Sequence, residues 1–149
     1  MRNGDFERGI AGWRASSSVG RALAGSKRAH GGEQAAGLCG SNNCAASLAQ
    51  TISIPAGTPA ARLSFYTYIE TEETGRAFDF LSVELRAPGG KALKTLLRLS
   101  NADPTDSWRQ SVIDLSDYAG REVELIFTAT SGKLKPTEFF IDDVSVTVQ

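Results

Sequence analysis

Phe139-Phe140-Ile141-Asp142-Asp143-Val144-Ser145-Val146-Thr147-Val148 is the stretch that decides the fold, because it alternates apolar and polar residues as a half-buried β-strand does. The apolar residues that share one face of this strand are Phe140, Val144, Val146 and Val148. Asp142 falls on the same face, where an ionised carboxylate is costly unless a cation pairs with it. Its natural co-ligands lie at the other end of the chain, in residues 3–7. We therefore expect the first and last strands to be neighbours, joined through a calcium ion, in a closed β-sandwich.

A simpler interpretation of the two aspartates stays open. Asp142 and Asp143 also fit ordinary polar residues near the end of a strand, satisfied by backbone N–H groups or by an arginine. The position of Asp142 on an apolar face favours the cation.

Length and composition predict one domain over residues 1–149. The chain has 41% hydrophobic and 22% charged residues, which is typical of a soluble globular protein. Its net charge of -1 indicates neither nucleic acid nor anionic lipid as a partner. No apolar run approaches the roughly 20 residues that cross a bilayer, so no membrane insertion is expected.

Short alternating segments, separated by Gly, Pro, Asn and Asp at short intervals, predict an all-β fold. Strands are expected at residues 19–24, 35–38, 47–54, 63–70, 78–86, 93–99, 108–115, 123–129 and 139–148. Pro88-Gly89-Gly90-Lys91 predicts a hairpin, and one helical turn is expected near Tyr118. The architecture is therefore an antiparallel β-sandwich with little or no helix.

Two cysteines, Cys39 and Cys44, flank a short segment with Gly and Asn at its centre. They are either free buried thiols or a short-loop disulfide, and the turn composition favours the disulfide. One histidine and two cysteines at this spacing make no zinc pattern.

Catalysis has little support in the sequence. The single histidine, His30, lies in a Gly-rich loop, and no nucleophile elbow, zinc-binding helix motif or phosphate loop is present. Carboxylate pairs such as Glu70 with Glu72 lie in charged loops, where a solvated surface explains them better than glycosidase chemistry. No enzymatic activity is predicted.

Aromatic residues suggest a binding surface. Tyr66 and Tyr68 are two apart on a strand face that points away from the Leu63 and Phe65 core, and Trp108 and Arg76 are candidates to join them. Aromatic faces stack on pyranose rings, while acids, amides and arginine bind their hydroxyls. The alternatives are that both tyrosines pack into a second layer covered by the early strands, and that Trp108 is a structural plug.

The chain resembles two related kinds of jelly-roll domain. The opening Asn3-Gly4-Asp5-Phe6-Glu7 followed by Trp13 is similar to calcium-dependent carbohydrate-binding modules. Four further stretches resemble MAM-like domains: residues 47–52, 63–69, 114–120 and the closing Phe140-Ile141-Asp142-Asp143-Val144. The resemblance covers nearly the whole chain and implies a jelly-roll, galactose-binding-like sandwich of a secreted bacterial protein.

In those families a structural calcium ion is held by an N-terminal Glu, the first Asp of the final pair and backbone carbonyls. The resemblance therefore implies Glu7 and Asp142 as calcium ligands, with a carbonyl of Gly4 or Asp5 and one near Gly31. The cysteine turn is a departure from those relatives.

The resemblance also implies an extracellular accessory module, fused to or associated with a larger secreted protein. The expected partner is a glycan, and the alternatives are a protein partner in adhesion or a passive stabilising appendage of a hydrolase.

Overall fold

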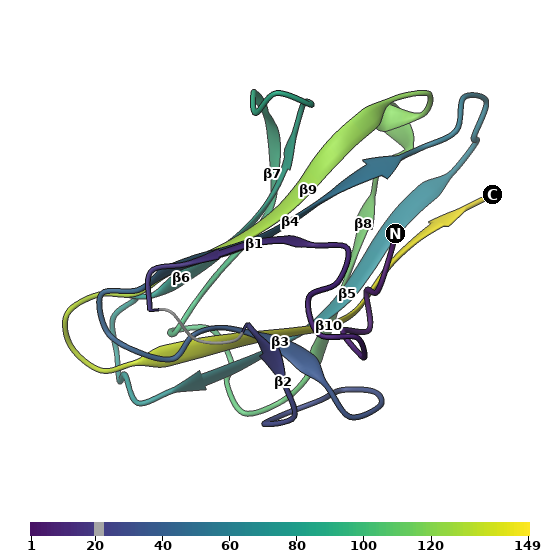
Figure 1. Ribbon diagram of the computed structural model, residues 1–149. Coiled ribbons are helices and arrows are strands. Elements are labelled where there is room, and N and C mark those ends of the chain that lie inside the picture. Colours follow the sequence, from purple (N-terminus) through teal and green to yellow (C-terminus); the bar gives the residue numbers. More distant parts are fainter. Residues whose placement is uncertain (20–22) are drawn as a thin grey trace.

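The computed structural model, which describes residues 1–19 and 23–149, shows two antiparallel five-stranded sheets packed face to face (Figure 1). The first sheet has the order β1 (Arg14–Ser17), β4 (Ala45–Ser53), β9 (Glu122–Thr130), β6 (Phe80–Arg86) and β7 (Ala92–Ser100). The second has the order β2 (Ala24–Gly25), β3 (Ala35–Cys39), β10 (Thr137–Val148), β5 (Ala61–Thr71) and β8 (Arg109–Asp114). The predicted antiparallel β-sandwich is confirmed.

Most of the predicted strands are present with ends shifted by a few residues. Of the strand expected at residues 19–24, positions 20–22 lie outside the described residues. The expected helical turn is a short 3-10 helix, η1 (Ser116–Tyr118). In the described part of the chain, no helix is both long and apolar enough to cross a membrane.

The core lies between the two sheets and follows the period-two pattern of the strands. In β5, Leu63, Phe65 and Ile69 are buried, while Tyr66 and Tyr68 on the other face are half-buried. The predicted inward residues of β6 and β9 are likewise buried: Leu81, Val83, Leu85, Val123, Leu125, Phe127 and Ala129.

Trp13 closes one side of this core. Its ring stacks on Phe6 with centroids 5.2 Å apart and lies against Phe127. Its indole N–H donates to the carbonyl of Asn3 at 3.0 Å, so the polar end of the side chain has a partner although the ring is buried.

The predicted disulfide is present between Cys39 at the end of β3 and Cys44 just before β4. Because β3 and β4 belong to different sheets, the bridge joins the two layers.

The last strand differs from the prediction at Asp142. Phe139 and Ile141 point into the core, whereas Phe140 and Asp142 lie on the outer face, paired with Tyr68 and Tyr66. A β-bulge between Asp142 and Ser145, with Asp143 at a φ of 48°, shifts the alternation by one residue. Val144 and Val146 therefore return to the core side, and the expectation that Asp142 shares their face is wrong.

The expected pairing of the first and last strands is also wrong. β1 pairs with β4, and β10 pairs with β3 and β5. Residues 3–7 form turns rather than a strand, but they do reach β10, because the N–H of Val144 donates to the carbonyl of Gly4 at 2.8 Å. The two termini lie at the same end of the sandwich (Figure 1).

Candidate functional site

A strap formed by residues 27–31 covers part of the outer face of the second sheet. On this face β5 and β10 present three cross-strand pairs in succession: Glu70 with Glu138, Tyr68 with Phe140, and Tyr66 with Asp142. The strap runs across all three pairs and contacts each with a different residue.

Lys27 covers the first pair. Two carboxylates directly opposite each other on neighbouring strands repel. The Nζ of Lys27 bridges them, at 2.7 Å from Glu70 and 2.9 Å from Glu138. The hydrogen bond from Lys27, together with that from Arg28, lowers the pKa of Glu70, and the two carboxylates raise the pKa of Lys27.

Arg28 covers the second pair. Its guanidinium lies over the Tyr68 ring at 4.0 Å from the centroid and 5.6 Å from that of Phe140. It also donates to Glu70 at 2.8 Å, so the stacked guanidinium is held in place by an ion pair.

His30 and Gly31 cover the third pair. The His30 ring stacks on Tyr66 with centroids 3.7 Å apart and planes at 17°, and its Nδ1 lies 2.6 Å from Asp143 Oδ2. Trp108 lies edge-on to His30 at 5.6 Å and to Tyr68 at 5.5 Å. Three of the four predicted ligand residues, Tyr66, Tyr68 and Trp108, thus gather in one aromatic cluster beneath the strap.

Arg76 does not join this cluster. It is exposed in the loop after β5, where its carbonyl accepts a hydrogen bond from the Asn101 side chain at 2.8 Å. The cation that lies over Tyr68 is Arg28, which was not among the predicted ligand residues. The adjacent Lys27-Arg28 pair was the available signal, but nothing in the sequence indicates which aromatic face the loop covers.

The predicted calcium ligand Asp142 is fully buried under the strap. Its Oδ2 accepts hydrogen bonds from the backbone N–H groups of His30 at 2.8 Å and Gly31 at 3.2 Å, and its Oδ1 accepts from Asp143 at 2.8 Å. Burial raises the pKa of the Asp142 carboxyl, and the N–H donors act against this shift.

Glu7, the other predicted carboxylate ligand, holds the next residues of the same loop. Its Oε1 accepts from the backbone N–H groups of Glu33 and Gln34, each at 2.9 Å. Asp142 and Glu7 therefore both anchor the loop at residues 30–34, one from the last strand and one from the N-terminal turns.

The other predicted ligands lie near the N-terminal turns. Asp5 is exposed and accepts from the N–H of Glu7 at 3.4 Å, and the Gly4 carbonyl accepts from Val144. No group of three or more His, Cys, Asp or Glu side chains in the described ranges 1–19 and 23–149 could hold a metal ion. The predicted set has fewer side chains and more carbonyls. Asp142 Oδ2 and Glu7 Oε1 each accept two N–H groups, whereas Asp142 Oδ1 and Glu7 Oε2 each accept one. An oxygen with two lone pairs and one donor still has capacity for a cation. The residues present therefore fit a calcium ion in donor type.

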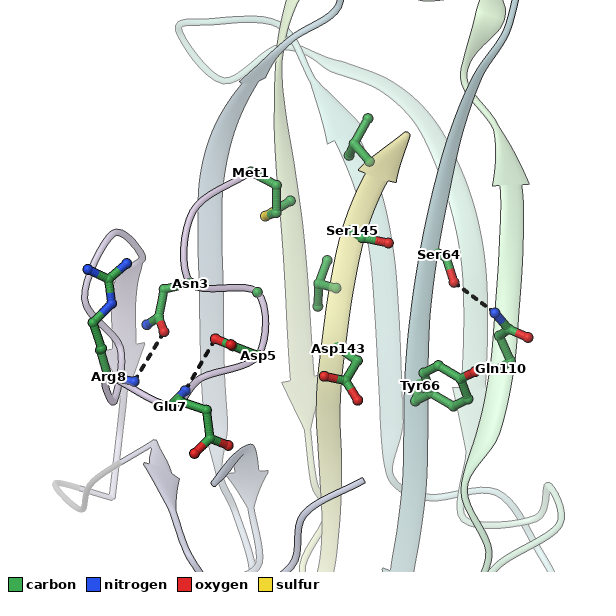
Figure 2. Close-up of a pocket in the computed structure, with 13 residues that line it drawn as sticks. Met1, Asn3, Asp5, Glu7, Arg8, Ser64, Tyr66, Gln110, Asp143 and Ser145 are labelled. Atoms are coloured by element: carbon green, nitrogen blue, oxygen red, sulfur yellow. Dashed lines mark hydrogen bonds between the residues drawn. The ribbon is translucent and has the colours of Figure 1, made fainter. Parts of the chain in front are cut away.

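Beside the strap the outer face opens into a pocket of about 750 Å³ (Figure 2). Asp5, Glu7 and Arg8 of the N-terminal turns form one wall, and Asp143 and Ser145 of β10 form the floor. The opposite wall consists of Ser64, Tyr66 and Gln110 from β5 and β8, with the Gln110 side-chain amide donating to the Ser64 hydroxyl at 3.0 Å. Tyr66 is the predicted ligand residue that reaches this pocket.

The model of the MAM domain family (meprin/A5/mu) matches residues 4–149. No curated protein matches the chain.

Solved structures share the fold at low sequence identity. The carbohydrate-binding module TmCBM61, solved in complex with β-1,4-galactotriose, has a TM-score of 0.72 and 20% identity, and the match covers 100% of this chain and 97% of that one. The K3 cleaved adhesin domain of Lys-gingipain from Porphyromonas gingivalis has a TM-score of 0.71 and 18% identity over 97% and 96% of the chains. A family 16 carbohydrate-binding module has a TM-score of 0.62 and 18% identity over 97% and 96%. The shared feature is the β-sandwich.

Proposed function

The chain belongs to the MAM domain family, and from this premise we propose that it is a non-catalytic binding module that recognises carbohydrate through the pocket beside the strap. The similarity to a module that binds β-1,4-galactotriose supports a glycan as the ligand.

The chemistry of the pocket is the observation that carries this proposal. Sugar hydroxyls act both as donors and as acceptors, and the pocket offers an amide in Gln110, hydroxyls in Ser64 and Ser145, and carboxylates in Asp5 and Asp143. Tyr66 adds an aromatic wall for an apolar sugar face. A volume of about 750 Å³ lies within the range of about 300–1,000 Å³ for small-molecule sites.

Titration calorimetry with β-1,4-galacto-oligosaccharides, followed by a glycan array, tests the proposal. Gln110→Ala should weaken binding by roughly two- to tenfold, because a hydrogen bond from an exposed amide to a ligand is worth about 0.5–1.5 kcal/mol. Thr51→Ala, an exposed change on β4 of the other sheet, is the matched control and should leave the affinity unchanged. Full affinity of the Gln110 variant would place the contact elsewhere, and absence of binding to every glycan would leave a passive appendage.

A structural calcium ion is the second part of the proposal. Asp142 is a buried carboxylate whose ionised form is disfavoured by burial, and a cation beside it would restore that form. Glu7 and Asp142 would supply carboxylate oxygens, with Asp5, Gly4 and Gly31 as nearby sources of further oxygens. The ion would tie the last strand to the N-terminal turns.

Thermal unfolding with calcium and with excess chelator tests the ion. Calcium should raise the Tm of the wild-type protein, since a ligand that binds only the folded state stabilises it by mass action. Asp142→Asn should abolish this rise. An identical Tm in calcium and in chelator for the wild type would contradict the site.

A protein partner is the second candidate function, and one surface favours it. Phe78 and Leu134 are 43% and 64% exposed and line a shared hollow of about 520 Å³ with Lys133 and Lys135, on loops outside the strands. Exposed apolar side chains that cluster are typical of protein contacts. Phe78→Ser with Leu134→Ser would abolish an interaction made there while leaving glycan binding intact.

An extracellular location completes the proposal. Disulfides persist in oxidising compartments, and the bridge between Cys39 and Cys44 supports export of the parent protein. Retention of the bridge in protein isolated without added oxidant is the expected result of a thiol titration.

A further inference from the structure

The strap limits how a glycan can lie on the second sheet. Its residues occupy three successive cross-strand pairs of β5 and β10, from Glu70 with Glu138 to Tyr66 with Asp142. The next pair along the strands, Ser64 with Ser145, lies in the open pocket. The pocket therefore begins where the strap ends, at the stacked rings of His30 and Tyr66.

The strap bounds this end of the pocket, because His30 contacts Tyr66 and Asp143, two residues that line it. His30 is held by its stack on Tyr66 at 3.7 Å and by its contact with Asp143 at 2.6 Å, and the backbone on either side is bound by Asp142. A sugar that passed under the strap would have to break these contacts together with the Arg28 stack on Tyr68.

A second, adjacent side of the pocket is closed by the N-terminal turns (Figure 2). Asn3 braces this wall, because its side-chain amide donates to the carbonyls of Gly9 at 3.0 Å and Ala11 at 2.9 Å and accepts from the N–H of Arg8 at 3.2 Å. On the opposite side the pocket ends at Gln110 of β8, which is an edge strand of its sheet.

We propose, building on the proposed function, that the pocket binds the end of a glycan chain and not its interior. A straight internal segment needs two openings that lie opposite each other. The strap closes one end of the direction along the strands, and the N-terminal wall closes one end of the direction across them, so neither direction has two opposite openings. A chain end needs only one opening, and the side at β8 provides it. The pocket volume of about 750 Å³ suits roughly two or three sugar units, which is the size of a drug-like ligand.

Chain-end binding predicts how affinity depends on ligand length. Titration with β-1,4-galacto-oligosaccharides of increasing length should show the affinity rising to the trimer and changing less than twofold beyond it. For long β-1,4-galactan, the number of binding sites should follow the number of chain ends. Shortening the polysaccharide with an endo-hydrolase at constant mass should therefore raise the measured number of sites in proportion to the ends created.

The outcomes separate this inference from the proposed function. Chain-end binding would be overturned if the number of binding sites were proportional to the total mass of polysaccharide, or if the affinity kept rising with chain length. Either result would leave carbohydrate recognition in place. If no galactan binds, the same length series is run with the best ligand of the glycan array. Absence of binding to every glycan would overturn both.

A strap variant gives an independent test. Lys27→Ala, Arg28→Ala and His30→Ala together remove all three covering side chains, and none of these residues lines the pocket. Trimer affinity should stay within twofold of the wild type, while longer chains should gain at least about fivefold because the face over Tyr68 opens. If the variant unfolds cooperatively and its affinity depends on glycan length as that of the wild type does, the strap does not limit the length of glycan that the site binds.

Discussion

Gly32 lies in the loop at residues 30–34, at a position where a side chain is disfavoured by the backbone conformation and by a close neighbouring atom. Its φ of 62° lies in the left-handed region, and an added Cβ would lie 2.3 Å from Glu7 Oε1. That carboxylate cannot move away freely, because its Oε1 accepts two backbone N–H groups at 2.9 Å. The glycine therefore allows the N-terminal turns to reach the loop.

Gly32→Ala should lower the free energy of unfolding by about 2–4 kcal/mol, from about 1–2 kcal/mol of left-handed strain and about 1–2 kcal/mol of lost hydrogen bonds to a charged group. Gly57→Ala is the control, since Gly57 has a φ of 79° with nothing within 4 Å of an added Cβ. Urea unfolding of both variants isolates the contribution of the Glu7 contact. Equal losses in the two variants would show that Glu7 does not hold the loop.

Asp142 shows where prediction from the sequence reaches its limit at the scale of a residue. Asp142 and Glu7 were predicted as calcium ligands, and in the structure both carboxylates accept hydrogen bonds from the loop at residues 30–34. The predicted face of Asp142 was wrong. Alternation assigns a face only while the strand is regular, and the left-handed conformation of Asp143 moves every later residue to the opposite side. An Asp at that position tolerates this conformation, yet nothing local in the sequence requires it.

At the scale of an element, the strap contrasts with the strands it covers. Strand positions could be predicted because burial on one face imposes a period of two, as in Leu63, Phe65 and Ile69 of β5. Residues 27–31 carry no such period, and their position depends on contacts with Glu70, Tyr68 and Tyr66 that lie far along the chain. The sequence therefore predicted that Tyr66 and Tyr68 share a face that Trp108 could join. It offered covering of the tyrosines as an alternative, but by the early strands and not by the strap.

The ion pairs of the strap predict a loss of stability in acid. Lys27 and Arg28 lower the pKa of Glu70 in the folded state. The stabilisation that these ion pairs give is therefore fully present above the pKa of Glu70 in the unfolded chain, about 4.3. It is lost as the pH falls through the lower pKa of Glu70 in the folded protein. Glu70→Gln should destabilise the protein by about 1 kcal/mol at pH 7, since the cations are partly exposed, and by progressively less below pH about 4.

Urea unfolding of the wild type and the Glu70 variant between pH 3 and 7 measures this difference. Glu122→Gln is the matched control, because Glu122 is exposed at the start of β9 and forms no ion pair in the part of the chain that the structure describes. A difference that stays constant across this pH range would mean that the ion pairs of Glu70 contribute nothing to folding.

At the scale of the molecule, the Cys39–Cys44 bridge joins the two sheets beside the start of β10, because Cys39 pairs with Glu138, whereas the C-terminus follows the other end of that strand. Hydrogen bonds tie the segment between the two cysteines to both sheets, since the N–H of Gly40 donates to the carbonyl of Thr137 on β10 at 2.8 Å and that of Asn43 to the carbonyl of Gly132, just after β9, at 2.8 Å. The N-terminal turns join the layers at another place, where the side-chain oxygen of Gln50 on β4 accepts from the N–H of Arg2 at 2.6 Å.

Removal of the bridge should therefore loosen one end of the molecule without abolishing the fold. Cys39→Ala with Cys44→Ala should lower the free energy of unfolding by about 2 kcal/mol, as the chain-entropy model gives for a loop this short. Alanine keeps the buried positions apolar, so the loss reports the crosslink more than a new polar group. Reductant should lower the Tm of the wild type and leave the double variant unaffected. Because the bridge is distant in sequence from the pocket residues of β5 and β8, glycan affinity should persist in the variant, and its loss there would mean that the two ends of the sandwich are coupled.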